Sequence, residues 1–198
     1  RTKLITGAIK QFKCCSVDKK KERIIVPRFG VFEILNDKFK LGNFRTKSQI
    51  RDGQKPETTY SWKGKLTNNQ NIIYEEIFKN YYLNKRVEYG SAGLILNLEA
   101  GQGKSYLAAY VAYKLQKKTA IIMHSTSLLE QWSKVLQNCF GKSVSIGYYY
   151  AKKKVDGDFV LIIIDSATSH DFKVNGEIKT PIEYFSQFGF IIYDECHT

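Results

Sequence analysis

The stretch L-E-A-G-Q-G-K-S occupies residues 98–105 and is the most informative part of the sequence. It follows an apolar run at residues 92–98, which predicts a strand buried on both faces. Residues 103–117 have apolar side chains at helical spacing, so the glycine-containing turn lies between a strand and a helix. This is the context of a phosphate-binding loop. Gly101 and Gly103 allow backbone N–H groups to approach an anion without Cβ clashes, and the helix N-terminus adds its dipole.

The side chains that end this loop favour a nucleotide and its metal ion. Lys104 can reach the β- and γ-phosphates, and the Ser105 hydroxyl can ligate Mg²⁺. The general P-loop pattern has glycine where Leu98 stands, and a glycine-rich turn can also be a plain loop. We predict nucleotide binding because the strand, the loop and the helix occur together. The predicted contact residues are Glu99, Ala100, Gly101, Gln102, Gly103, Lys104 and Ser105.

A second motif, F-G-F-I-I-Y-D-E-C-H, occupies residues 188–197. Apolar residues lead into two acids at the C-terminal end of a predicted strand, where open α/β sheets bind their ligands. There Asp194 would direct Mg²⁺, and Glu195 would orient and deprotonate an attacking water molecule. Taken alone, such an acidic pair is most often a solvated loop. The 90 residues from Lys104 to Asp194 leave room for several βα units, so the two motifs can lie close together in one sheet.

The pattern around these motifs predicts an α/β domain. Strands alternate with helices, which gives a parallel sheet covered by helices on both faces. We place a domain boundary near Leu66, so that a basic N-terminal region at residues 1–65 precedes a domain at residues 66–198 that is incomplete at its C-terminal end. The other predicted strands lie at residues 119–123, 144–150, 159–164 and 189–193. The other predicted helices lie at residues 69–82, 127–140 and 181–185.

The positive charge of the chain is concentrated in its first third. The formal net charge is +12, and residues 1–65 hold 17 Lys and Arg against 6 Asp and Glu. Residues 66–198 hold 14 against 13. A basic segment beside a nearly neutral domain suggests a polyanionic partner, of which nucleic acid is the commonest. The alternative is a basic surface that serves solubility.

Several classes of protein and site are not expected. No window approaches the roughly 18 apolar residues of a membrane span, and no secretory signal pattern is present, so we expect no membrane partner. The four cysteines form no C-x-x-C pair, which argues against zinc and favours a reducing compartment such as cytoplasm or nucleus. The sequence starts at Arg1 rather than Met, so we expect it to be a piece of a longer protein.

Together, L-x-x-G-x-G-K-S and D-E-C-H resemble motifs I and II of superfamily-two helicases. With leucine at position 98, motif I resembles that of the branch that contains XPB-type and phage UvsW-type enzymes. The transcript-release DNA helicases of poxviruses and other large DNA viruses look related to that branch. The resemblance covers residues 66–198 and implies a RecA-like domain of a DExH-box ATP hydrolase. It also implies a catalytic role for His197, and virion or host cytoplasm as the compartment if the protein is viral and acts in viral transcription.

Three further segments resemble helicase motifs that contact nucleotide or nucleic acid. The L-T-N-N-Q segment at residues 66–70 resembles one that precedes motif I, which implies that Gln70 contacts the adenine edge. The alternative is an ordinary polar residue at a helix N-terminus. Residues 124–132 resemble motif Ia, and residues 164–169 resemble a later motif. The hydroxyl groups in these segments would contact strand phosphates, or alternatively cap helices. The residues predicted to make these contacts are Ser125, Thr126, Ser127 and Ser166.

Other conspicuous residues have structural explanations. Trp132, Tyr110 and Tyr113 are expected in the core, and the three tyrosines at residues 148–150 on a half-buried strand. The lysines at residues 152–154 are expected to form a solvated loop, with phosphate contacts as the alternative.

We expect an ATP-dependent helicase or translocase that acts on nucleic acid, DNA rather than RNA. ATP would lie between this domain and a second RecA-like domain that these 198 residues do not contain, so we expect this chain alone to hydrolyse ATP very slowly. An RNA helicase and a duplex translocase that does not separate strands are the alternatives. A nucleotide kinase or GTPase would need an arginine-rich lid or an N-K-x-D motif, which we do not find; a non-catalytic nucleic-acid-binding module is a further alternative.

Overall fold

The computed structural model describes residues 52–82, 93–174 and 176–195, together with four short strands nearer the N-terminus. The chain divides into two compact units, Arg1–Lys47 and Ser48–Thr198. In the first unit the described strands form two antiparallel pairs. These are β1 (Thr2–Lys3) with β2 (Ile9–Lys10), and β3 (Ser16–Asp18) with β4 (Arg23–Ile25).

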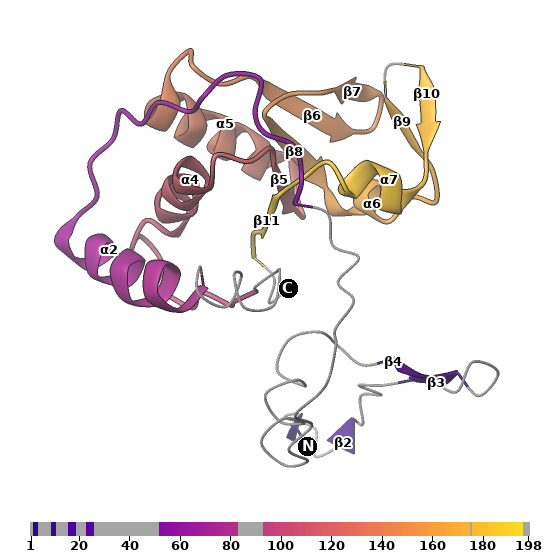
Figure 1. Ribbon diagram of the computed structural model, residues 1–198, viewed down its shortest axis with the longest axis horizontal. Helices are drawn as coiled ribbons and strands as arrows, with labels where there is room; N and C mark the ends of the chain where they lie inside the picture. The colour runs from indigo at the N-terminus through magenta and orange to yellow at the C-terminus, as the bar shows by residue number, and fades with distance from the viewer. Residues whose placement is uncertain are drawn as a thin grey trace. The chain divides into compact units, whose positions relative to one another are not determined.

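A five-stranded sheet forms the centre of the second unit (Figure 1). In spatial order its strands are β11 (Phe190–Tyr193), β5 (Thr119–Met123), β8 (Phe159–Ile163), β6 (Ile146–Tyr150) and β7 (Lys153–Val155). The first four strands are parallel, whereas β7 is antiparallel to β6. The predicted α/β class is therefore confirmed, and the sheet is mostly rather than wholly parallel.

The edge strand β7 replaces part of a predicted loop. A two-residue turn joins it to β6, which is too short for the crossover that a parallel pair needs. The prediction of a solvated loop at residues 152–154 is wrong for Lys153 and Lys154, which lie in this strand. Their Nζ atoms lie 3.8 Å and 3.6 Å from the ring centres of Tyr148 and Tyr149, respectively. Cation–π contacts of this kind hold the two lysines on the sheet edge.

The two faces of the sheet have different covers. One face packs against α4 (Lys104–Leu115) and α5 (Thr126–Phe140), as Figure 1 shows. The other packs against α7 (Pro181–Phe185), which was predicted, and against a hairpin of β9 (Phe172–Val174) and β10 (Glu177–Lys179). The sequence pattern did not predict this hairpin. Both faces are covered by apolar packing because successive side chains of a strand point to opposite faces: Ile121 packs on the first face and Ile122 on the second. A short helix, α6 (Ile164–Ala167), follows β8.

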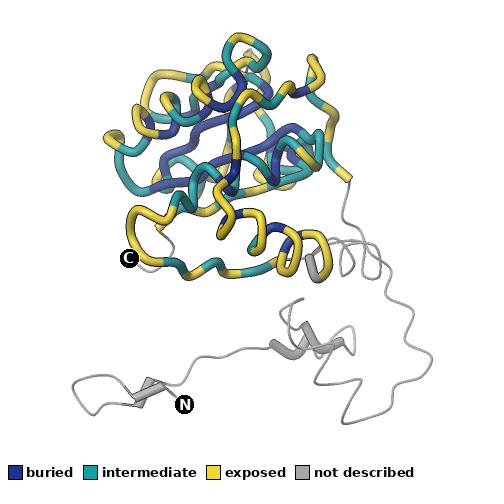
Figure 2. Tube along the Cα trace, turned by 90° about the vertical axis from the view of Figure 1, so that its left-hand side faces the viewer, coloured by how far each residue is buried: buried dark blue, intermediate teal, exposed yellow. Residues whose placement is uncertain are grey.

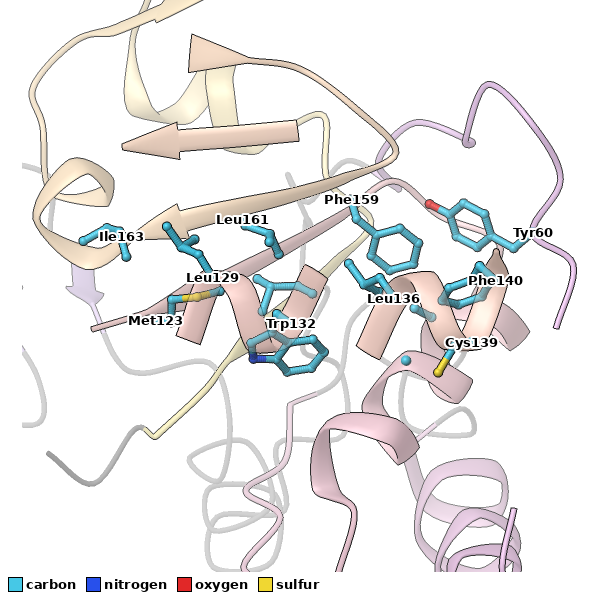
Figure 3. Packing of buried hydrophobic residues seen from close by; sticks show 13 residues of the cluster. Tyr60, Met123, Leu129, Trp132, Leu136, Cys139, Phe140, Phe159, Leu161 and Ile163 are labelled. Atoms are coloured by element: carbon cyan, nitrogen blue, oxygen red, sulfur yellow. The ribbon is translucent and has the colours of Figure 1, made fainter. Parts of the chain in front are cut away.

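The core on the α4–α5 face extends to residues before the predicted domain boundary. Figure 3 shows Tyr60 packed beside Phe140 and Phe159, and its ring lies 4.9 Å from that of Phe159. The single hydrogen of the Tyr60 hydroxyl is shared between the backbone oxygens of Lys117 and Asp158, which lie 3.0 Å and 3.2 Å from the phenol oxygen. Residues 48–65 thus belong to the compact unit that holds the sheet, since the chain divides into compact units after Lys47, and the functional domain boundary near Leu66 stays a prediction.

The segment that leads into the P-loop is not a strand. Residues 93–98 alternate between exposed and partly buried, and Ile95 is 83% exposed. Figure 2 shows this contrast with the fully buried central strands. Leu94 and Leu96 pack against a cluster beside α4, while Gly93, Ile95 and Asn97 are exposed among the described residues. The prediction of a strand buried on both faces is wrong for these residues, because within the described part of the chain they pair with no strand and every second residue is exposed.

The predicted helix at residues 69–82 forms in two parts. It begins as α2 (Asn68–Ile73) and continues as a π-helix, η1 (Tyr74–Tyr82). Tyr74 and Phe78 are buried against α4. Among the described residues, no helix has the length and apolar character that a membrane crossing requires.

Candidate functional site

The glycine-containing loop adopts the backbone conformation that an anion site needs. Gly101 and Gly103 have φ angles of 80° and 73°, in the left-handed region that favours glycine. Gly103 is the N-cap of α4, which has no side-chain cap and no acidic residue in its first turn. The first N–H groups of α4 therefore lack a side-chain acceptor within the cap, and they carry the positive end of the helix dipole.

Lys104 is the first residue of α4, and its side chain reaches back to this loop. Its Nζ atom donates hydrogen bonds to the backbone oxygens of Leu98 and Glu99, at 2.8 Å and 3.3 Å. The ammonium group is thus held at the loop rather than extended into solvent. Together with the helix N-terminus it supplies cationic and N–H donors for phosphate oxygens.

The acidic motif lies at the end of β11. The backbone N–H of Asp194 donates to Ile122 O at 2.9 Å, which continues the pairing of β11 with β5. The Asp194 carboxylate accepts a hydrogen bond from the indole N–H of Trp132 at 2.7 Å. Glu195 is exposed and has a φ of 55°, an uncommon conformation for a non-glycine residue that often occurs at functional sites. Residues 196–198, including His197, lie outside the described residues.

One cavity contains both motifs. It has a volume of about 540 Å³, and its lining includes Lys104 and Ser105 from the start of α4 and Asp194 and Glu195 from the end of β11. The donor set fits a nucleotide phosphate with Mg²⁺. Ammonium and N–H groups suit phosphate oxygens, while hydroxyl and carboxylate oxygens suit the metal. Folding brings together two motifs that are 90 residues apart in the chain.

Gln70 contacts the loop through a helix-capping arrangement. Its Oε1 accepts from the backbone N–H of Thr67 at 2.9 Å, and Thr67 Oγ1 accepts from the backbone N–H of Gln70 at 3.3 Å. This capping box begins α2. The Gln70 Nε2 donates to Gln102 O at 3.3 Å, and the residue is only 7% exposed. The helix-terminal role is thus observed, and the same amide also touches the P-loop backbone.

The hydroxyl-bearing segments lie along the same sheet edge. Ser125, Thr126 and Ser127 follow β5, and Ser166 lies in α6 after β8. Since β11, β5 and β8 are parallel neighbours, the segments share the carboxyl edge with Asp194.

The capping alternative for these hydroxyl groups receives little support. Ser125 is the N-cap residue of α5, but its side chain makes no cap hydrogen bond. Its hydroxyl instead lies 2.8 Å from that of Ser127. The N-cap of α6 is Ile163, so Ser166 does not cap that helix.

Two contacts at the site were missed by sequence reasoning. Trp132 was predicted only as a core residue; it is buried, and it also binds the Asp194 carboxylate. The need of a buried indole N–H for an acceptor is the signal that could have suggested this contact. The Tyr193 hydroxyl lies 3.3 Å from His124 Nε2, which joins the ends of the neighbouring strands β11 and β5. No sequence pattern marked that pair.

The chain belongs to the family described as type III restriction enzyme, res subunit, whose model matches residues 63–198. It is 26% identical over 153 residues to a protein of Acanthamoeba polyphaga mimivirus named "Putative ATP-dependent RNA helicase". It is 32% identical over 103 residues to a protein of Escherichia phage T5 named "Probable helicase". These matches cover 75% and 52% of this chain. They span only 26% and 20% of the respective relatives.

Proposed function

We propose that this chain is the first ATP-binding domain of a nucleic-acid-dependent helicase or translocase. The observation that carries the proposal is the shared cavity, in which the P-loop start of α4 and the acidic end of β11 line one space. Membership of the res-subunit family and similarity to two viral proteins named as helicases support the same function.

Each polar residue of the cavity has a role in this proposal. Lys104 binds the β- and γ-phosphates, and the loop N–H groups bind phosphate oxygens. Mg²⁺, held by Ser105 and Asp194, neutralises phosphate charge when it is bound. Glu195 orients the attacking water molecule and accepts its proton. His197 of the D-E-C-H box and Gln70, as a contact of the adenine edge, complete the proposed set.

The nucleic-acid strand runs along the carboxyl edge of the sheet in this proposal. The hydroxyl groups of residues 125–127 and of Ser166 lie at that edge, where they can bind phosphates. DNA is the proposed substrate, through the resemblance of the motifs to the XPB-type and UvsW-type branch and to viral transcription helicases. RNA is the second candidate, because the mimivirus relative carries the name of an RNA helicase.

A second RecA-like domain completes the motor. In phosphoryl transfer an arginine that stabilises the transition state contributes a factor of about 10³–10⁵ in rate. We propose that this arginine comes from the second domain, as it does in the helicases that the motifs resemble. By itself this chain then binds ATP but hydrolyses it at a nearly basal rate.

Nucleotide binding tests the proposal through Lys104→Ala. Loss of its ammonium group should raise the dissociation constant of a fluorescent ATP analogue at least tenfold, about 1.4 kcal/mol. Lys114→Ala is the matched control, because it removes the same charge from the other end of α4. Equal affinities of wild type and Lys104→Ala would refute the P-loop assignment.

A further inference from the structure

Trp132 connects the buried core of the domain to the acidic motif. It lies on α5 and is only 2% exposed. Its indole N–H donates to Asp194 Oδ2 at 2.7 Å, a short hydrogen bond to a carboxylate. Hydrogen bonds to an ionised acceptor are about twice as strong as neutral ones. The contact therefore constrains the orientation of the Asp194 side chain.

The donor itself is rigidly held. Trp132 belongs to the cluster on the α4–α5 face, beside Leu129 and Leu136, which are almost fully buried (Figure 3). A tryptophan in such a core cannot rotate away without leaving a cavity. Asp194 is fixed at a second point, because its backbone N–H pairs with Ile122 in β5. Asp194 Oδ2 thus accepts a hydrogen bond from a core residue, and this bond rather than solvent restricts the rotation of the carboxylate.

We propose that Trp132 is a positioning residue for the metal-binding carboxylate: its N–H holds Asp194 Oδ2 so that Oδ1 is directed to the Mg²⁺ of the bound nucleotide. This inference rests on the proposed function of the cavity. Trp132 also lines that cavity together with Lys104 and Ser105, so it lies beside the ligands that it would help to arrange. Outer-shell partners of metal ligands typically contribute about 10–100-fold to metal affinity.

A role confined to packing predicts a different result. Trp132→Phe keeps a buried aromatic ring but removes the N–H group, so a packing role would change stability and leave Mg²⁺ binding as it is. Trp62 is the matched control, since it is the other of the two tryptophans and packs in an aromatic cluster with Tyr106 and Phe140. It is not among the residues that line the cavity.

The experiment measures binding of a fluorescent ATP analogue by the 198-residue chain while Mg²⁺ is titrated. In Trp132→Phe the half-saturating Mg²⁺ concentration should rise about tenfold. In Trp62→Phe it should stay within about twofold of wild type. Affinity for the analogue in EDTA should be the same in all three proteins, because the indole N–H acts only through the metal ligand. The same Mg²⁺ dependence in both variants would overturn the inference, while the proposed function would stand.

A second measurement keeps the inference testable if Trp132→Phe does not fold. In the Trp62→Phe chain, Trp132 is the sole tryptophan, and its emission should change when Mg²⁺ is added to the nucleotide complex. This change should disappear in Asp194→Asn on the same background. A response that survives Asp194→Asn, or the lack of a response in the parent, would overturn the inference. Failure of wild type to bind the analogue at all would instead refute the proposed function, and the inference with it.

Discussion

Gly103 is a glycine for two separate reasons. Its φ of 73° costs an L-residue about 1–2 kcal/mol. In addition, a Cβ at this position would lie 2.4 Å from Gln70 Nε2. That amide is buried and donates to Gln102 O, so moving it aside would break a hydrogen bond. Gly101 has only the first reason, because a Cβ there meets no atom within 4 Å.

The pair of glycines allows strain and clash to be separated. We expect Gly101→Ala to lower the free energy of unfolding by about 1 kcal/mol. Gly103→Ala should cost about 1 kcal/mol more, since it also disrupts the Gln70 hydrogen bond. Chemical denaturation of both variants measures this difference. Adding Gln70→Ala to each should remove the excess; an excess that persists would mean that Gln70 is not what the new methyl group meets.

Among the elements, the segment at residues 52–66, here called the strap, contributes to the core although its composition suggests a linker. It contains Tyr60, which is 2% exposed and packs in the core against Phe159 of β8. Burial and, to a lesser extent, the charge of Asp158 raise the pKa of the Tyr60 phenol far above its usual value. The group therefore stays protonated and remains a donor to the Lys117 and Asp158 backbones.

Substitutions of Tyr60 test whether this strap stabilises the domain. Tyr60→Phe keeps the ring but removes this donor, while Thr119 still donates to both backbone oxygens, so we expect the unfolding free energy to fall by about 1 kcal/mol. Tyr60→Ala should cost about 3–5 kcal/mol through the cavity it leaves. Tyr113→Phe, at a partly buried position in the neighbouring aromatic cluster, is the control and should have a small effect. If Tyr60→Phe behaved like this control, the shared hydrogen bond of the Tyr60 hydroxyl would contribute nothing measurable.

At the scale of the whole molecule, the two compact units differ in charge. Residues 1–47 hold 13 Lys and Arg against 4 Asp and Glu, a net of +9 out of the total of +12. If nucleic acid is the partner, this unit should supply most of the phosphate contacts. Each contact with duplex DNA contributes about −0.9 to the slope of log affinity against log salt, and each contact with a single strand about −0.7.

Deletion of residues 1–47 tests this assignment. The cut follows the boundary between the compact units, so Tyr60 and the rest of the strap remain. We expect the shortened chain to bind oligonucleotides more weakly and with a salt slope closer to zero. Fluorescence anisotropy at several salt concentrations, with DNA and RNA of the same sequence, measures both the slope and the preferred nucleic acid. Identical slopes for the two chains would reduce the basic unit to a solubility feature.

The sequence by itself determined the α/β class, most strands and helices of the sheet unit, and the two motifs of the site. Strong local signals explain this success. A continuous apolar run at residues 119–123 is typical of a buried strand, and apolar side chains at helical spacing predict α5. G-K-S after a glycine-containing turn predicts a loop followed by a helix.

Only the tertiary structure decided features that depend on what lies opposite a segment. The apolar run at residues 93–98 pairs with no strand of the described sheet and is half exposed, whereas lysines of the predicted loop form β7 because β6 lies beside them. Likewise Trp132 meets Asp194 only after β5, α5 and β11 are assembled. Local sequence records the preference of a segment, whereas burial and hydrogen-bond partners are supplied by residues far away in the chain.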